Sequence, residues 1–258
     1  MKPRVLILSG YGFNCEKESK FAFEQSSGSA DIVHLNTIIE NPKILHEYSL
    51  FLLGGGFSFG DDLGSGVVVA NKIRSKLKET ILDFIAAKKL ILAVCNGFQV
   101  VVKLGLLPYP DFEQRATLTF NDSGHFEDRW VNLKINPKSP SIFTKGIDML
   151  PLPVRHGEGK FIPANEVVLK DLIDKNLITA QYADERGKLA SYPVNPNGSI
   201  ANIAGICDPS GRIYGMMPHP EAFTNPYLSP EWPGNPTKEG LGLRIFKNAV
   251  DYLTKEGF

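Results

Sequence analysis

The stretch KLILAVCNGFQ, residues 89–99, decides what kind of fold this chain forms. Its first half is a continuous apolar run, and Cys95 follows directly before the turn residues Asn96 and Gly97. A run that is apolar on both of its alternating faces is typical of a strand buried inside a parallel sheet. A cysteine at the point where such a strand ends in a glycine-containing turn is either a packed residue at the end of the strand or a nucleophile exposed above the end of the sheet.

Similar apolar runs recur before this stretch and alternate with amphipathic segments. Strands are predicted at 4–8, 30–35, 49–53 and 89–95, and helices at 16–26 and 71–89. Alternation of this kind marks βαβ units, so we expect an α/β fold with an open, mostly parallel twisted sheet flanked by helices. Ligands of such a sheet bind at the carboxyl ends of its strands.

The pattern changes after about residue 108. The later strand candidates are short and separated by turns at 195–199 and 208–212, which predicts mixed or antiparallel strands added to the parallel core. They are ATLTF (116–120), WVNLKI (130–135), NIAGIC (202–207) and RIYGMM (212–217). Residues 224–236 are proline-rich and have no evident role, and 238–257 predict a final amphipathic helix. Without repeats or a linker, we expect a single domain over residues 1–258.

Composition narrows the class of function. Lys and Arg total 28 and Asp and Glu total 28, so no basic surplus favours nucleic acid or an anionic membrane. No apolar run approaches the roughly 20 residues that cross a bilayer, and RVLILSG (4–10) is too short for a signal peptide. The 3 cysteines have irregular spacing without a zinc pattern. We expect a soluble, cytoplasmic protein with free thiols and no metal.

A cysteine nucleophile needs a base, and one of the five histidines has the right neighbours. In MPHPE (217–221), prolines flank His219 and should keep the segment extended, which would place Glu221 on the same face as the ring. A carboxylate there would hold the imidazole in one tautomer. The alternative is a stiff turn with a surface histidine. Of the other histidines, His34 and His46 are best explained as packed or solvated, and His125 sits in a polar loop.

The glycine run in LLGGGFSFGDD (52–62) follows another predicted strand. It matches neither phosphate-binding glycine motif, so nucleotide binding is unsupported. Backbone N–H groups there could instead converge on an oxyanion, with the N–H of Asn96 as a second donor. A simple tight turn is the alternative. Together the three motifs favour acyl transfer by Cys95, His219 and Glu221 at one edge of the sheet.

With these residues in place, the chain resembles the class I glutamine amidotransferases, whose fold is flavodoxin-like. The class is marked by the cysteine elbow and the His-x-Glu pair. More narrowly it is similar to the family of glutaminase subunits of phosphoribosylformylglycinamidine synthases in purine biosynthesis. The stretches GFNCE, GGGFSFGD, VCNGFQ, SGHFEDRWVNLKI and PVRHGEGKF occur in the order of the family, and HGEG and the NPNGS stretch before IAGIC narrow the match.

The resemblance implies a role for each matching residue. Cys95 would attack the side-chain amide of glutamine to give a γ-glutamyl thioester and ammonia, with His219 as base and acid and Glu221 orienting it. Further residues would complete the site: Gly56 or Phe57 and Asn96 for the oxyanion hole, Gln99 and Gly55 for substrate, and His156 and Glu158 of HGEG for the pocket or an interface.

The resemblance also implies partners. Free ammonia is mostly protonated in neutral water, so it must reach an acceptor enzyme directly, and no ATP-binding motif occurs in these residues. We therefore expect a larger ATP- and Mg-dependent synthetase subunit, a small bridging subunit, no cofactor in this chain, and a glutaminase gated by the partner. The alternatives are an amidotransferase subunit of another pathway, or a redox sensor that uses Cys95.

Overall fold

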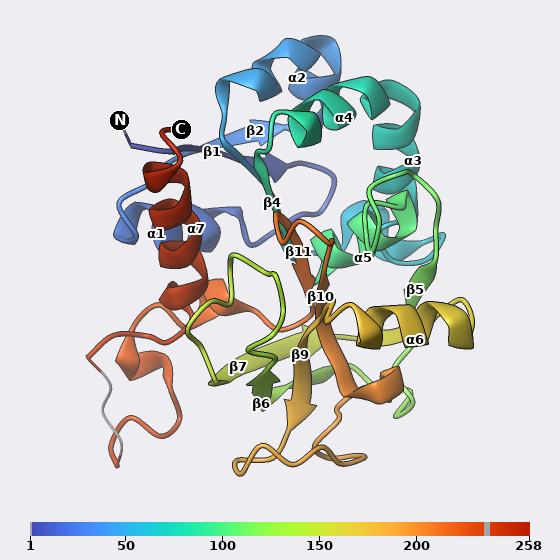
Figure 1. Ribbon diagram of the computed structural model, residues 1–258, viewed down its shortest axis with the longest axis vertical. Coiled ribbons are helices and arrows are strands. Elements are labelled where there is room, and N and C mark those ends of the chain that lie inside the picture. Colours follow the sequence, from blue (N-terminus) through green and yellow to red (C-terminus); the bar gives the residue numbers. More distant parts are fainter. Residues whose placement is uncertain (1, 235–237) are drawn as a thin grey trace.

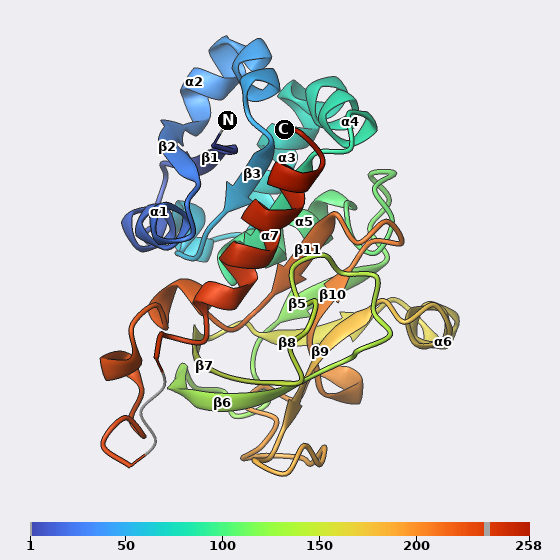
Figure 2. The same ribbon diagram turned by 60° about the vertical axis from the view of Figure 1, so that its left-hand side comes forward.

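The computed structural model describes residues 2–234 and 238–258, and residues 235 and 236 of the proline-rich segment therefore lie outside the described part. Figures 1 and 2 show a central sheet with helices packed on both faces. The helices are α1 (Glu16–Gln25), α2 (Leu35–Glu40), α3 (Val67–Lys76), α4 (Lys78–Ala86), α5 (Asn96–Leu104), α6 (Glu166–Asp174) and α7 (Leu243–Lys255). Short 3₁₀ helices occur at Pro42–Glu47, Ser58–Asp61, Ile200–Asn202, Pro220–Ala222 and Pro226–Leu228.

Eleven strands make one large and one small sheet in the described residues. The strands are β1 (Arg4–Ser9), β2 (Ser29–His34), β3 (Leu50–Leu53), β4 (Leu90–Val94), β5 (Ala116–Thr119), β6 (Glu127–Ile135), β7 (Met149–His156), β8 (Lys160–Pro163), β9 (Ile178–Ala183), β10 (Ile203–Cys207) and β11 (Ile213–Met216). The large sheet has the order β2-β1-β3-β4-β11-β10-β9-β6-β7, and β5 pairs with β8.

The large sheet is parallel in one half and antiparallel in the other. Strands β2, β1, β3, β4 and β11 pair in parallel, whereas β10, β9, β6 and β7 continue antiparallel. Every residue of β3 and β4 is buried, as expected of strands covered on both faces. In Figure 1, α1 and α7 cover one face of this half, and α3 and α5 cover the other. The predicted fold class is therefore confirmed.

Two predicted helices have different bounds from those expected. The segment 71–89 forms parts of two helices, because the backbone of Leu77 (φ −129°, ψ 8°) leaves the helical region between α3 and α4. The final helix begins at Leu243 rather than at 238. Before this helix, Gly240 packs against the backbone of Phe223, where a Cβ would be 2.3 Å from the carbonyl oxygen of Phe223.

The sequence interpretation missed α2, α6 and the strands β7, β8 and β9. Strand β7 was the hardest to see, because Pro151 and Pro153 interrupt its apolar pattern. Proline cannot donate to a strand ladder, so it is tolerated only at an edge. Strand β7 is the last strand of the sheet and pairs with β6 alone. None of the described helices has the length and apolar character needed to span a membrane.

Candidate active site

Cys95 lies on a strained turn between β4 and α5. Its backbone angles are φ 51° and ψ −107°, a conformation that a non-glycine residue adopts only when its surroundings enforce it. Gly97 makes the turn possible, because a Cβ at that position would lie 2.0 Å from the carbonyl oxygen of Leu53. The strand-to-helix turn thus has the small neighbours that a nucleophile elbow requires. Only 4% of Cys95 is exposed, yet its side chain lines a cavity.

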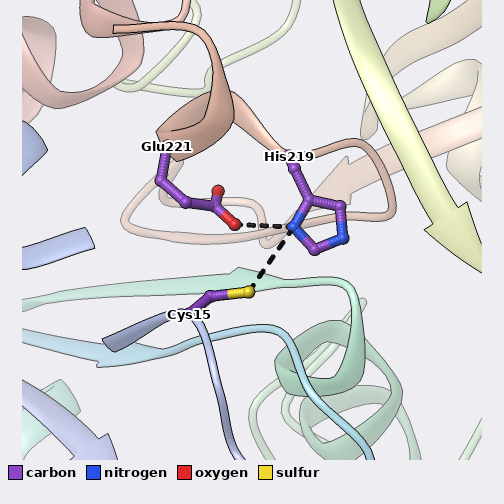
Figure 3. Close-up of side chains that lie close together, drawn as sticks. All are labelled: Cys15, His219 and Glu221. Atoms are coloured by element: carbon purple, nitrogen blue, oxygen red, sulfur yellow. Dashed lines mark hydrogen bonds and ion pairs between the residues drawn. The ribbon is translucent and has the colours of Figure 1, made fainter. Parts of the chain in front are cut away.

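The His219 ring is held by Glu221. Nδ1 of His219 lies 2.6 Å from Oε1 of Glu221, and the two side chains are 4% and 1% exposed (Figure 3). The segment is not extended throughout as predicted, since Pro220–Ala222 forms a 3₁₀ turn that begins with proline. His219 itself is extended, and the turn still brings the carboxylate to the ring. The paired residues are buried rather than on the surface.

The protonation of His219 follows from this environment. Burial on its own lowers the pKa of the imidazole. The Glu221 carboxylate and Cys95 raise the pKa by more than burial lowers it, so the net pKa lies well above its usual value. Nε2 of His219 is buried without a hydrogen-bond partner among the described residues. Because Nδ1 is taken by Glu221, Nε2 is the nitrogen left to exchange a proton with a substrate or a thiol.

The glycine loop after β3 and the start of α5 offer free backbone donors. The N–H groups of Gly56 and Asn96 have no hydrogen-bond acceptor within the described chain, whereas the N–H of Phe57 donates to the carbonyl of Gly12 over 2.9 Å. The sequence left Gly56 and Phe57 as equal alternatives, and this contact favours Gly56. Glycine stands at position 56 because its φ is 149° and because a Cβ there would lie 2.4 Å from the carbonyl oxygen of Gly12.

Two adjoining cavities open beside Cys95. One, of about 330 Å³, is lined by Cys95, His219 and Glu221, together with Gly56 and Phe57. The other, of about 130 Å³, shares Cys95, Gly56 and Phe57 and is also lined by Gln99, His156 and Glu158. Gly55 packs under the ring of His219. The predicted site residues, which lie far apart in the sequence, therefore meet at the carboxyl ends of β3, β4, β11 and β7.

A hydrogen-bonded chain joins the nucleophile turn to the HGEG loop. The side-chain amide of Asn96 donates to Oε1 of Gln99 over 2.8 Å, and the amide of Gln99 donates to the carbonyl of Glu158 over 2.7 Å. The Glu158 carboxylate in turn accepts from the N–H of Ser65 over 3.3 Å. Gln99 and Glu158 consequently form one fixed wall of the smaller cavity.

His156 is buried and neutral. Its Nδ1 lies 3.1 Å from Oδ1 of Asn121, which also accepts from the N–H of Gly159, so Nδ1 carries the proton. Burial, and secondarily the nearby His219, lower the pKa of His156 to about 3. Its Nε2 has no partner among the described residues. His156 thus presents an unprotonated nitrogen beside the site.

Several lining residues were not predicted. Cys15 stands out, because its Sγ lies 3.9 Å from Nδ1 of His219. The sequence signal for it is its place in GFNCE, a stretch that supports the family resemblance but gives the thiol no role of its own. Arg155 and Phe126 line both cavities, and Asp61 lines the smaller one. They lie in SGHFEDRWVNLKI, PVRHGEGKF and GGGFSFGD, which support the resemblance but give these side chains no role, because only the fold brings them to the cysteine.

Known proteins show the same arrangement of sequence and fold. A family model described as a CobB/CobQ-like glutamine amidotransferase domain matches residues 2–253. The phosphoribosylformylglycinamidine synthase subunit PurQ of Dehalococcoides mccartyi is 47% identical over 254 residues, covering 97% of this chain and 98% of that protein. The protein of the same name from Methanococcus maripaludis is 43% identical over 269 aligned residues, covering 98% of each.

A solved structure agrees with these relatives. A chain in the "Structure of PurLQS from Thermotoga maritima" superposes with a TM-score of 0.74 at 28% identity, covering 98% of this chain and 100% of that chain. The resemblance inferred from the cysteine elbow, the His-x-Glu pair and the HGEG and NPNGS stretches is thereby confirmed. The chain belongs to the CobB/CobQ-like glutamine amidotransferase family.

Proposed function

We propose that this chain is the glutaminase subunit of a phosphoribosylformylglycinamidine synthase and that Cys95, His219 and Glu221 are its catalytic triad. The observation that carries the proposal is the meeting of a cysteine on a strained elbow with a buried His–Glu pair in one cavity. The PurQ relatives, similar over nearly their full length, supply the pathway. The unbroken large sheet supports a single glutaminase domain over residues 1–258.

In the first half-reaction, the Cys95 thiolate attacks the amide carbon of the glutamine side chain. A C–S bond forms, and the carbonyl oxygen becomes an oxyanion that accepts hydrogen bonds from the N–H groups of Gly56 and Asn96. His219, which took the thiol proton, returns it to the leaving nitrogen. The C–N bond breaks, and ammonia and a γ-glutamyl thioester remain.

In the second half-reaction, water attacks the thioester with His219 as its base. The C–S bond breaks, glutamate leaves, and Cys95 is restored. Gln99 and Glu158 shape the wall of the smaller cavity, so we assign them and His156 to holding the α-amino and carboxylate end of glutamine. Gly55 gives the His219 ring room to approach the substrate, and Phe57 lines the cavity through which the substrate would reach the ring.

The partner is the ATP- and Mg-dependent synthetase subunit, with a small bridging subunit completing the complex, and this chain itself uses no cofactor. We assign the complex to the cytoplasm. The site also suggests gating. Nε2 of His219 has no hydrogen-bond partner in the described part of the chain, and Sγ of Cys95 points instead to the carbonyl of Arg155 at 3.6 Å. Docking of the synthetase would turn Sγ from that carbonyl into line with Nε2 and switch the glutaminase on.

The test is glutamate release from glutamine by the purified chain, alone and then with the synthetase subunit, ATP and formylglycinamide ribonucleotide. We expect slow release alone, a sharp rise in the complex, and loss of both in Cys95→Ser. Equal turnover with and without the partner would refute the gating. Activity of Cys95→Ser close to that of the unmodified chain would refute the triad.

A further inference from the structure

A second thiol lies against the catalytic histidine, on the side away from its free nitrogen. Cys15, in the loop between β1 and α1, places Sγ 3.9 Å from Nδ1 of His219 (Figure 3). The loop is fixed there, because the N–H of Asn14 donates to the carbonyl of Gly55 over 3.1 Å. The proposed glutaminase mechanism has no use for this thiol.

Cys15, His219 and Glu221 together form a compact set of metal-ligating atoms. Sγ, Nδ1 and a carboxylate oxygen all lie within 4.8 Å of one another, and His219 and Glu221 are buried. One sulfur, one imidazole nitrogen and one carboxylate oxygen are ligands that Zn²⁺ prefers, with water as a fourth. The cavity of about 330 Å³ is lined by all three residues and gives an ion a path and space for that water.

The distances suit a zinc ion after a small movement. With Zn–S of about 2.3 Å and Zn–N of about 2.0 Å, sulfur and nitrogen on a tetrahedral ion stand about 3.5 Å apart, so the 3.9 Å between Sγ and Nδ1 must close by about 0.4 Å. Nδ1 and Oε1 are 2.6 Å apart and must open to about 3.3 Å for tetrahedral ligation. Oε2 of Glu221 is buried without a partner among the described residues, so the rotation opens the contact of Oε1 with Nδ1 and breaks no hydrogen bond of Oε2.

We propose that Cys15, His219 and Glu221 form a Zn²⁺ site whose occupation inhibits the enzyme. The ion replaces the proton on Sγ of Cys15 and the proton that Nδ1 of His219 shares with Glu221, and both protons leave to solvent. The Cys15 thiolate and the Glu221 carboxylate then balance the two positive charges. Zinc would bind whatever reaction the chain catalyses, whereas the inhibition rests on the proposed function.

Inhibition follows from the two nitrogens of one ring. An imidazole bound to metal through Nδ1 keeps its remaining proton on Nε2. Nε2 can then no longer accept the proton of Cys95, and Glu221 no longer orients the ring. Zinc on this site therefore stops the reaction without touching the nucleophile.

The binding test is calorimetric titration of Zn²⁺ into the purified full chain. We expect one ion per chain, and a Kd raised more than about 100-fold in Cys15→Ala, because even the loss of an outer-shell partner costs about 10- to 100-fold. Cys207→Ala is the matched control, because Cys207 is also buried but contacts Ser139 on the antiparallel side, and it should bind zinc as the unmodified chain does. Cobalt as a spectroscopic probe should show a sulfur-to-metal charge-transfer band that Cys15→Ala lacks.

Circular dichroism establishes that each variant is folded, and Cys15→Ser, which nearly keeps the size of the thiol, repeats the test if the alanine variant is not. Unchanged zinc affinity in the Cys15 variants would overturn the site. Loss of affinity only in Cys95→Ala would overturn it too, since the ion would then sit on the nucleophile.

The inhibition is measured as glutamate release by the synthetase complex with ATP and Mg²⁺ at increasing Zn²⁺, relative to the zinc-free rate of each variant. We expect the unmodified chain to lose its activity at a zinc concentration about 100-fold below the one that inhibits Cys15→Ala. Zinc that binds without slowing the reaction would refute the inhibitory role. No glutamate release in the zinc-free complex would count against the glutaminase, and the calorimetry would still decide the zinc site.

Discussion

Replacing Gly55 by alanine should disable the enzyme while leaving the fold intact. A Cβ on Gly55 would lie 2.6 Å from Cε1 of His219 and 3.0 Å from Sγ of Cys15, whereas ordinary contacts begin at 3.4 Å. The ring must therefore retreat by 0.8 Å (3.4 − 2.6). A misplacement of about 1 Å at a reacting group can cost about 100-fold in rate, which is about 2.7 kcal/mol of barrier.

The assay is kcat for glutamate release by the complex with the synthetase. Gly54→Ala is the matched control, because its Cβ would meet its nearest neighbour, Cδ2 of Leu52, at an ordinary 3.6 Å. Neither glycine has a left-handed φ, so alanine adds no backbone strain at either position. We expect kcat to fall about 100-fold in Gly55→Ala and to stay near its original value in Gly54→Ala. Thermal unfolding shows whether both variants are folded.

Two results would refute this reasoning. If folded Gly55→Ala kept kcat within about threefold, the position of the His219 ring would not limit the reaction. If Gly54→Ala lost as much activity as Gly55→Ala, the effect would come from the loop backbone and not from the contact with the ring.

The buried histidines and the nucleophile turn yield three further predictions. Glu221→Gln removes the carboxylate that raises the pKa of His219, so kcat should fall by about 10²- to 10⁴-fold. A histidine pKa that is raised in the folded state stabilises the fold below the unfolded pKa, and this stabilisation is lost as pH rises through the folded pKa. Urea unfolding should therefore show the largest loss of unfolding free energy in Glu221→Gln below about pH 6.5. A loss that does not narrow with rising pH would refute the ion pair. Gly97→Ala forces a Cβ to 2.0 Å from the carbonyl oxygen of Leu53 and should destabilise the fold by at least about 1–3 kcal/mol in the same assay, so an unchanged midpoint would contradict the packing of β3 against α5. His156 has a pKa lowered to about 3 and takes up a proton on unfolding. The free energy of unfolding should therefore fall as the pH is lowered from about 6.5 to about 3, and it should fall less steeply in His156→Asn. Equal slopes in the two proteins would show that His156 is not held neutral.

The sequence determined most of the parallel half of the fold, although β11, which pairs in parallel with β4, was expected among the later strands added to the core. Runs such as LILAV and LFLL are apolar on both faces, and a strand covered on both faces has no other pattern, so β1, β3 and β4 were found within a residue or two. The antiparallel half was found only in part. Strand β7 carries prolines that local reasoning excludes from a strand, and the edge position that permits them is a property of the whole sheet.

The site divides in the same way. The sequence predicts the chemistry that depends on neighbours in the chain. These neighbours are the small residues around Cys95, the carboxylate two positions from His219 and the glycines at the end of β3. What tertiary structure decided was which groups are free and which are engaged. The N–H of Phe57 is used by Gly12, and the thiol of Cys15 rests on His219 from 204 positions away in the chain. Such contacts depend on the order in which β1, β3, β4 and β11 pair in the sheet, because that order brings the loops at their carboxyl ends together. The sequence indicates each strand but not which strand lies beside it.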